Sequence, residues 1–257
     1  MKVQLIFAAM SLAVLMGMVA FQLLGRRFAE RRVPAEGARG SGPAAIEASV
    51  FALLGLLVAF SFSGSETRLQ HRRELIVQEV DAIGTAYLRL DLLPEPDRAV
   101  LKEQFRQYVD VRVGYYKKLL DLDSARVERG RMEELQGKIW ARAVNASSRT
   151  GDVRASIILL PAINEMFDVT TARDAALRMH IPLVIFVFLA LLSFVCGFLA
   201  GMDMGKPERL SPLHVFIFAA TMALTAYVIL NLEFPRAGFV RMQYLDSMLA
   251  QLKTTMH

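Results

Sequence analysis

Four stretches without a single Asp, Glu, Lys or Arg constrain this chain more than any other feature. Each is 18 to 24 residues long, and they cover residues 3–25, 48–65, 179–202 and 210–232. A helix needs roughly 20 apolar residues to cross the hydrocarbon core of a bilayer. The chain is 54% hydrophobic, yet it carries 30 Lys and Arg and 25 Asp and Glu, all outside these stretches. This segregation predicts a polytopic membrane protein and excludes a soluble enzyme, a nucleic-acid-binding domain and a disordered chain.

The positive net charge of the chain follows the predicted membrane helices. Residues 66–178 contain 19 Lys and Arg and 18 Asp and Glu, so most of the net charge of +5 lies in the segments that flank the apolar stretches. Basic side chains in such places contact lipid headgroups and help to set topology. We therefore expect the lipid bilayer, and no nucleic acid, as a partner. The only cysteine, Cys196, lies within an apolar stretch and can form no intrachain disulfide.

The apolar stretches divide the chain into four parts. The first membrane helix, 3–24, is longer than the apolar core of a signal peptide, so we expect it to be retained. The basic segment 25–45 contains Pro and Gly and no apolar periodicity, which is typical of a connector. The predicted parts are membrane helices one and two with this loop (1–65), a helical extramembrane domain (66–178), membrane helices three and four (179–232) and an amphipathic tail (233–257) that packs on the stalk or the membrane surface.

Helix two is predicted to continue well beyond the membrane. Apolar residues recur after residue 65 at steps of four and three, and Arg73 occupies the one missing step. No proline interrupts residues 46–92, a length that would span about 70 Å as one helix. Since the bilayer takes about 30 Å of this length, the remainder would form a stalk. The residues of the repeat are Leu69, Ile76, Val80, Ile83, Tyr87 and Leu90.

Three more helices are predicted in the extramembrane domain, at 97–120, 125–146 and 152–179. Asp97 is a suitable N-cap for the first of them, and Pro161 is expected to kink the last. No segment alternates apolar and polar residues as a strand would. The predicted fold class is therefore all-α: four transmembrane helices, with an extramembrane helical domain continuous with helices two and three.

No pattern in the sequence points to catalysis. Metal-binding, phosphate-binding and nucleophile motifs are all missing, so we expect no enzyme, no cofactor and no metal site. Glu165 and Asp168 are three residues apart on one helix, close to Arg173 and Asp174. Such carboxylates can serve acid–base or cation chemistry, but an ion-pair network is favoured because no nucleophile or metal ligand accompanies them.

The candidate functional residues lie in the membrane section of helix two. Leu54, Val58 and Phe62 are spaced by four and stack on one face. If several copies of the chain surround an axis, this face forms rings of apolar side chains, a constriction that gates by dewetting. The alternative is a packing face against other helices of the same chain. Glu47, where helix two begins, marks either the entrance of an ion path or a membrane edge where the carboxylate reaches water.

Four segments resemble motifs of the bestrophin-like family of bacterial membrane proteins, and more distantly the bestrophin ion channels. The resemblance covers nearly the whole chain. The segments are 53–65 (LLGLLVAFSFSGS) with Arg68 and 72–74, 81–89 (DAIGTAYLR) with 92–94, 176–180 (ALRMH) and 232–236 (LEFPR).

The resemblance to bestrophins implies a homo-oligomeric, pentameric ion channel with helix two around the pore. It would place Leu54, Val58 and Phe62 at a hydrophobic neck and the helical domain in the cytoplasm, in a bacterial inner membrane. The number of Lys and Arg near the membrane ends leaves the orientation open. The tryptophan pair of bestrophins is replaced by His71, Arg72 and Arg73, and only Glu233 follows helix four, so calcium gating is not implied. The alternative function is a non-conducting scaffold or sensor whose 66–178 domain binds a protein partner.

Overall fold

The fold was obtained as a computed structural model that describes residues 2–31, 42–119, 121–149, 153–204, 211–235 and 243–256. These residues form helices, and no strand occurs among them, which confirms the all-α fold class. Four helical stretches are long and apolar enough to cross a membrane, which confirms the polytopic membrane class. The helices are α1 (Lys2–Arg31), α2 (Gly42–Arg89), the short 3-10 helix η1 (Leu90–Leu92), α3 (Asp97–Lys118), α4 (Leu122–Arg149), α5 (Val153–Arg178), α6 (Leu183–Met204), α7 (Pro212–Glu233) and α8 (Gln243–Thr255).

The chain forms two compact units, each assembled from two segments. The membrane unit comprises Met1–Leu69 and His180–Arg241, and the helical unit comprises Gln70–Met179 and Met242–His257. Helix α2 contributes its first part to the membrane unit and its second part to the helical unit. The predicted tail is divided in the same way, because α8 belongs to the helical unit.

Helix α2 is the longest element, with 48 residues and no break, as the sequence predicts. At 1.5 Å per residue it is about 72 Å long. At the step of the repeat that the sequence assigns to Arg73, the structure differs from the prediction. Arg72 is buried, whereas Arg73 is half-buried, so Arg72 occupies the inward position on the stalk.

Helix α1 is longer than predicted, and the predicted connector 25–45 is correspondingly shorter. Helix α1 continues to Arg31 and α2 begins at Gly42, so the rest of the connector lies outside the described residues. The extension is stabilised by an ion pair between Arg26 and Glu30, with a 2.7 Å distance between Nε and Oε1. Charge-free windows locate the lipid-facing part of a helix, but a helix of Arg, Ala and Glu continues readily into water.

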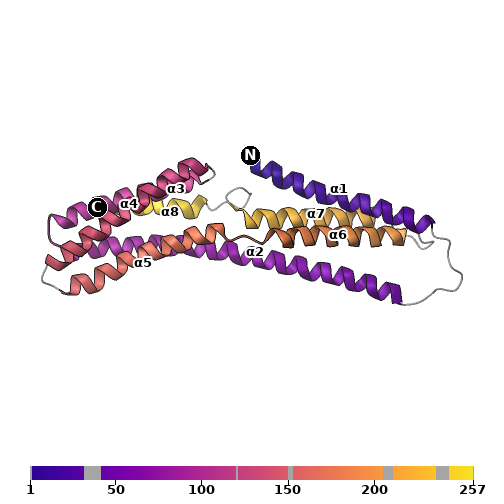
Figure 1. Cartoon of the computed structure of the whole chain (residues 1–257), viewed down its shortest axis with the longest axis horizontal. Coiled ribbons are helices and arrows are strands. Elements are labelled where there is room, and N and C mark those ends of the chain that lie inside the picture. Colours follow the sequence, from indigo (N-terminus) through magenta and orange to yellow (C-terminus); the bar gives the residue numbers. More distant parts are fainter. Residues whose placement is uncertain are drawn as a thin grey trace. The chain divides into compact units, whose positions relative to one another are not determined.

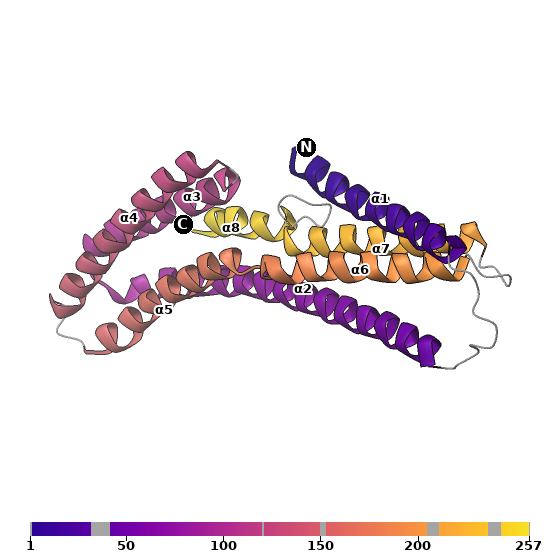
Figure 2. The ribbon, with the colours of Figure 1, turned by 45° about the vertical axis from the view of Figure 1, so that its right-hand side comes forward.

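Helices α1, α6 and α7 pack side by side in the membrane unit (Figures 1 and 2). Glycines allow the backbones of α1 and α6 to approach closely. A Cβ atom at Gly201 would lie 2.0 Å from the carbonyl oxygen of Gln22, and one at Gly25 would lie 2.0 Å from the carbonyl oxygen of Phe198. The Gly197-x-x-x-Gly201 spacing is therefore used inside the chain, where small residues let helix backbones come together.

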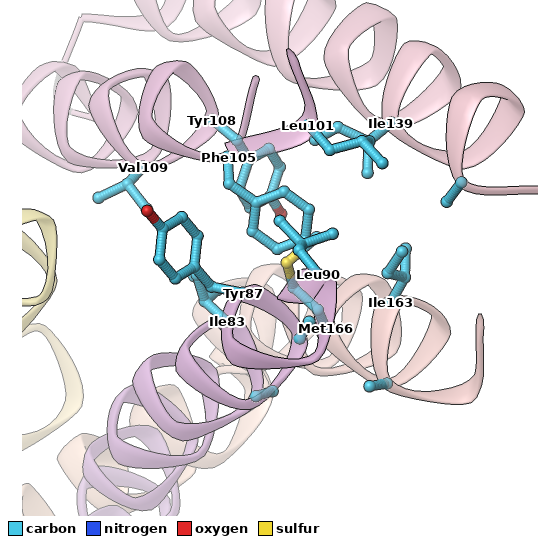
Figure 3. Packing of buried hydrophobic residues seen from close by; sticks show 14 of the residues in the cluster. Ile83, Tyr87, Leu90, Leu101, Phe105, Tyr108, Val109, Ile139, Ile163 and Met166 are labelled. Carbon is cyan, nitrogen blue, oxygen red and sulfur yellow. The ribbon is translucent and has the colours of Figure 1, made fainter. Parts of the chain in front are cut away.

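The helical unit has a continuous apolar core between α2, α3, α4, α5 and α8 (Figure 3). Phe105 and Tyr108 of α3 point into this core, as do Ile83 of α2 and Met166 of α5. Helix α8 packs against α3, where Lys253 Nζ lies 2.7 Å from Asp110 Oδ2. The amphipathic tail is thus the fifth helix of the extramembrane core.

Asp97 has a different role from the predicted helix cap. It is the first residue of α3, while Pro96 is the N-cap residue and makes no side-chain cap hydrogen bond. The Asp97 carboxylate instead accepts hydrogen bonds from Arg142 (3.0 Å) and Arg149, both on α4. The carboxylate therefore joins two helices rather than ending one.

Helix α5 contains Pro161 and ends at Arg178, and four residues separate it from α6, which begins at Leu183. A proline within a helix cannot donate a backbone hydrogen bond and crowds the carbonyl four residues earlier. Close to this place, Arg89 Nη1 donates to the carbonyl oxygen of Ile158 at 2.9 Å. The end of α2 is thereby fastened to α5 in the turn before Pro161.

Candidate functional site

The three predicted neck residues on α2 differ in their exposure. Leu54 is 1% exposed and packs within the membrane unit. Val58 is half-buried and lines a cavity together with side chains of α1, α6 and α7, whereas Phe62 is 42% exposed. Each step of four residues rotates the side chain by about 40° around a helix. The row therefore turns from the helices of the same chain towards the outside, and only Phe62 is available to a neighbouring molecule.

The membrane section of α2 is the least covered of the four membrane helices. Only 6% of its most apolar window is buried, compared with 17% for α1, 22% for the stretch that includes α6 and 28% for α7. The side chains of Leu53, Leu56 and Phe60 are exposed, and a Cβ atom at Gly55 would meet no described atom within 4 Å. This part of α2 therefore offers a broad apolar surface to lipid or to another copy of the chain.

Glu47 lies near the beginning of α2 and is half-buried. Its position at the predicted membrane edge fits both sequence-based interpretations, an ion-path entrance and a carboxylate that reaches water.

The most elaborate polar site of the membrane unit surrounds Glu233, the last residue of α7. Its side chain is completely buried and accepts hydrogen bonds from Ser65 Oγ (3.1 Å), Arg68 Nη2 (3.0 Å) and the backbone N–H of Ile181 (2.9 Å). His180 Nδ1 lies 3.3 Å from Glu233 Oε1, and the His180 ring stacks on Phe234. We call these residues the Glu233 cluster.

The Glu233 cluster connects the middle of α2 to the residues just before α6 and to the end of α7. A calcium ion is coordinated by six to eight oxygen atoms through their lone pairs, and hydrogen-bond donors that point at a carboxylate compete with it. The Glu233 carboxylate is instead surrounded by N–H and O–H donors. No group of three or more His, Cys, Asp or Glu that could hold a metal ion occurs in the part of the chain that the structure describes. The Glu233 cluster therefore connects helices through an ion pair with Arg68 and hydrogen bonds. A carboxylate that binds calcium would instead need oxygen atoms that are free to coordinate the ion.

The Glu233→Gln variant is expected to loosen the membrane unit. The amide removes the negative charge opposite Arg68 and turns part of the acceptor into a donor, which should lower the free energy of unfolding by about 1–2 kcal/mol. Arg68 is partly exposed and can recover some hydration, which limits the loss. The measurement is the rate at which a thiol reagent labels Cys196, the buried single cysteine of this unit, in increasing denaturant.

Glu30→Gln is the matched control for this variant. It removes the same charge from the same unit, but Glu30 is exposed and pairs with Arg26 on the surface. Such a pair contributes less than about 1 kcal/mol. Equal labelling rates for the two variants would mean that the Glu233 cluster does not hold the helices together.

Arg72 performs a related task within the helical unit. Its guanidinium is buried and donates to the carbonyl oxygens of Ala176 (3.1 Å) and Met179 (2.6 Å). The last carbonyls of a helix have no partner within the helix and carry partial negative charge. Arg72 therefore closes the C-terminal end of α5, at the position where bestrophins have a tryptophan pair.

A second buried ion cluster lies in the helical unit, around Glu79 of α2. Arg112 Nε on α3 donates to Glu79 Oε1 at 2.6 Å, and Arg173 on α5 donates to the other oxygen. These three side chains are at most 2% exposed. Asp174 Oδ1 lies 3.4 Å from Arg112 Nη1, and the Tyr116 hydroxyl lies 3.4 Å from Glu79 Oε2. One carboxylate thus connects α2, α3 and α5, and we call this group the Glu79 cluster.

The electrostatics of the Glu79 cluster fix the protonation states of Arg112 and Tyr116. Burial lowers the pKa of Arg112, but the Glu79 carboxylate and the Tyr116 and Tyr108 side chains together raise it by more, so the net pKa is above its ordinary value. Burial and the same carboxylate raise the pKa of the Tyr116 phenol well above its ordinary value. Tyr116 therefore remains neutral and able to donate a hydrogen bond, and the cluster is a satisfied ionic lock.

The ion-pair network expected near Glu165 and Asp168 is found for their neighbours only. Arg173 and Asp174 belong to the Glu79 cluster, with Asp174 also accepting from Arg129 at 3.2 Å. Glu165 and Asp168 lie on the exposed side of α5. Asp168 and Arg173 are five residues apart, which places their side chains about 140° apart around the helix, so proximity in sequence did not decide which carboxylates are buried.

The importance of Glu79 and Glu233 was not apparent from the sequence. One signal was available for Glu233, because three of the motifs quoted for the bestrophin-like resemblance contribute Arg68, His180 and Glu233 to the same site. For Glu79, the sequence offered no comparable signal, because the predicted repeat places the neighbouring Val80 at that step.

The apolar helices, the long α2 and the internal ion clusters define the class of this molecule as a polytopic α-helical membrane protein. The sequence profile of the bestrophin-like domain matches residues 12–244. The chain therefore belongs to the bestrophin-like family, as its motifs indicated. No curated protein and no solved structure matches the chain.

Proposed function

We propose that the protein is a homo-oligomeric ion channel, pentameric as the resemblance to bestrophins implies, in which the membrane section of α2 faces the axis. The observation that carries this proposal is the low coverage of that section, of which 6% is buried. A pore-lining helix must leave one face free of its own chain. The family also supports the proposal, since the chain belongs to the bestrophin-like family.

The neck of the proposed pore is built around Phe62. The exposed phenyl groups of Phe62 from the several chains can surround the axis of the oligomer. Narrow apolar constrictions of this kind gate by dewetting. Leu54 and Val58, the other two neck residues, are more buried than Phe62 and pack against other helices of the membrane unit. This packing fixes the rotation of α2 about its own axis. Glu47 would attract cations or set the local charge at the opposite end of the path. We propose the bacterial inner membrane, with the helical unit in the cytoplasm.

The alternative proposal is a non-conducting scaffold or sensor whose helical unit binds a protein partner. It is favoured by exposed apolar side chains on that unit, notably Leu88, Val153 and Ile157, which are 66–70% exposed. Exposed apolar patches of this kind are typical of protein interaction sites. Copurification of one partner at fixed stoichiometry with an oligomer that carries no current would favour this alternative.

Phe62→Ala is expected to increase the unitary current of the reconstituted protein. Removing the aromatic ring widens the constriction and lowers the cost of wetting it, so we expect a change of roughly twofold or more. The measurement is single-channel recording in planar bilayers, with oligomeric state checked by size-exclusion chromatography and light scattering.

Phe60→Ala is the matched control for the pore. Phe60 is also exposed, has the same chemistry and lies at nearly the same depth, but on the opposite side of α2. It should leave the current unchanged. A larger effect of Phe60→Ala than of Phe62→Ala would overturn the assigned face, and silent, well-folded oligomers would overturn conduction itself.

A further inference from the structure

The membrane unit contains a cavity of about 130 Å³ that is lined by residues of α1, α6 and α7 and by Val58 of α2. Most of the cavity wall is apolar and includes Val14, Phe186 and Ile229. Three hydroxyl-bearing residues, Ser11, Ser193 and Thr225, interrupt this apolar lining.

Ser11 differs from the other two in its hydrogen bonding. Ser193 Oγ donates to the carbonyl oxygen of Leu189 at 2.7 Å, and Thr225 Oγ1 donates to that of Thr221 at 2.8 Å. This back-bonding is the usual arrangement for a hydroxyl within a membrane helix. Ser11 is 8% exposed, and its Oγ has no hydrogen-bond partner among the residues that the structure describes. A buried hydroxyl without a hydrogen-bond partner is unfavourable, so a bound molecule that forms a hydrogen bond with Ser11 Oγ would remove this cost.

The size and lining of the cavity restrict what such a molecule can be. An apolar cavity of about 150 Å³ accommodates one benzene molecule, a volume close to that found here. Ordered water is less suitable, because each buried water needs two to four polar partners, whereas most of the residues that line this cavity are apolar. A plain hydrocarbon would fill the volume but leave Ser11 without a partner.

We propose that this cavity binds a small, uncharged and mostly apolar molecule that carries one hydrogen-bonding group, of the size and chemistry of a phenol. The ring occupies the apolar part of the cavity, and its hydroxyl exchanges a hydrogen bond with Ser11 Oγ. Because Val58 forms one wall, the bound molecule also fills the space between α2 and the other membrane helices. The site is independent of conduction and would exist in a non-conducting protein.

The test uses the full chain in lipid nanodiscs and a photoreactive benzyl alcohol with a diazirine group as the probe. Labelled residues are located by mass spectrometry, and phenol and benzene are compared as competitors. We expect labelling of cavity residues on α1, α6 or α7, with phenol competing about tenfold better than benzene, as one additional hydrogen bond would give.

Two variants and one control identify the group that recognises the hydroxyl. Ser11→Ala should reduce the preference for phenol to less than about twofold while labelling persists. Ala226→Leu should fill the cavity and abolish labelling. Ser49→Ala removes an exposed hydroxyl on α2 that bonds the carbonyl of Ala45, and should change nothing.

Several outcomes would overturn the proposal. Equal competition by phenol and benzene in the unaltered protein would mean that the cavity admits hydrocarbon only, such as a lipid chain. Absence of labelling in the cavity would mean that it holds water or nothing. A preference for phenol that survives Ser11→Ala would assign recognition to another group.

Discussion

The Glu79→Gln variant is expected to destabilise the helical unit by about 3–5 kcal/mol, because breaking a buried ion pair on one side leaves an uncompensated buried charge. Two guanidinium groups depend on the Glu79 carboxylate, and the side chains of all three residues are almost completely buried. Asp174 Oδ1 also lies 3.4 Å from Arg112 Nη1, so in the variant Arg112 keeps one carboxylate neighbour, whereas Arg173 loses the charge of Glu79. The substitution keeps the volume and shape of the side chain, so packing alone predicts little change.

Fluorescence of the single tryptophan, Trp140 on α4, reports unfolding of the helical unit directly. The unfolding midpoint in denaturant should be much lower for Glu79→Gln than for Glu165→Gln, which changes an exposed glutamate on α5. Similar midpoints for the two variants would show that the cluster contributes no net stability.

A third variant separates the charge from the packing. Replacing Glu79, Arg112 and Arg173 together by Leu, Met and Leu removes the carboxylate and both guanidinium groups that it binds at once. Buried ion pairs replaced by apolar groups of similar volume are often neutral or stabilising by about 1–4 kcal/mol. Recovery in the triple variant would assign the loss in Glu79→Gln to the unpaired arginines.

The Gly201→Ala variant is expected to destabilise the membrane unit by about 3 kcal/mol, near the upper end of the usual cost of overpacking. The added Cβ atom would lie 2.0 Å from the backbone carbonyl oxygen of Gln22, so α1 and α6 must separate. A backbone atom cannot move aside as a flexible side chain can. Alanine is the better helix former by up to about 1 kcal/mol, and the clash must exceed this gain.

Cys196 lies on α6, five residues before Gly201, and is buried, so its labelling by a thiol reagent reports opening of the membrane unit. Labelling should be much faster in Gly201→Ala than in the unaltered protein. Gly137→Ala on α4 is the control, because a Cβ atom there meets no described atom within 4 Å and should stabilise its helix slightly. Unchanged labelling in Gly201→Ala would contradict the close approach of α1 and α6.

Much of the fold could be predicted because it depends on local properties of the chain. The length of an apolar stretch decides whether a helix can cross the bilayer, and the absence of proline allowed α2 to be predicted as one long helix. The predicted ends were less accurate, since α1 extends to Arg31 through charged residues that favour helix as well as apolar ones do.

The candidate site was predicted only in part, for a physical reason that Leu54 and Phe62 illustrate. Periodicity tells which residues of a helix share a face, but it does not tell which neighbour covers that face. Leu54 is covered by its own chain and Phe62 is not, although both were placed in one row. Whether Phe62 and its copies form a neck stays a prediction until currents are recorded.

By itself, the sequence determined that this protein crosses a membrane several times, that it is entirely helical and that α2 extends far beyond the lipid, because hydrophobic length and helix propensity are properties of neighbouring residues. Only the tertiary structure decided which charges are buried and what they bind. Glu79 and Arg173 are 94 residues apart, and Ser65 and Glu233 are 168 residues apart. A charge can be buried only where opposite charges and donors converge on it, and that convergence arises from the packing of helices distant in the chain.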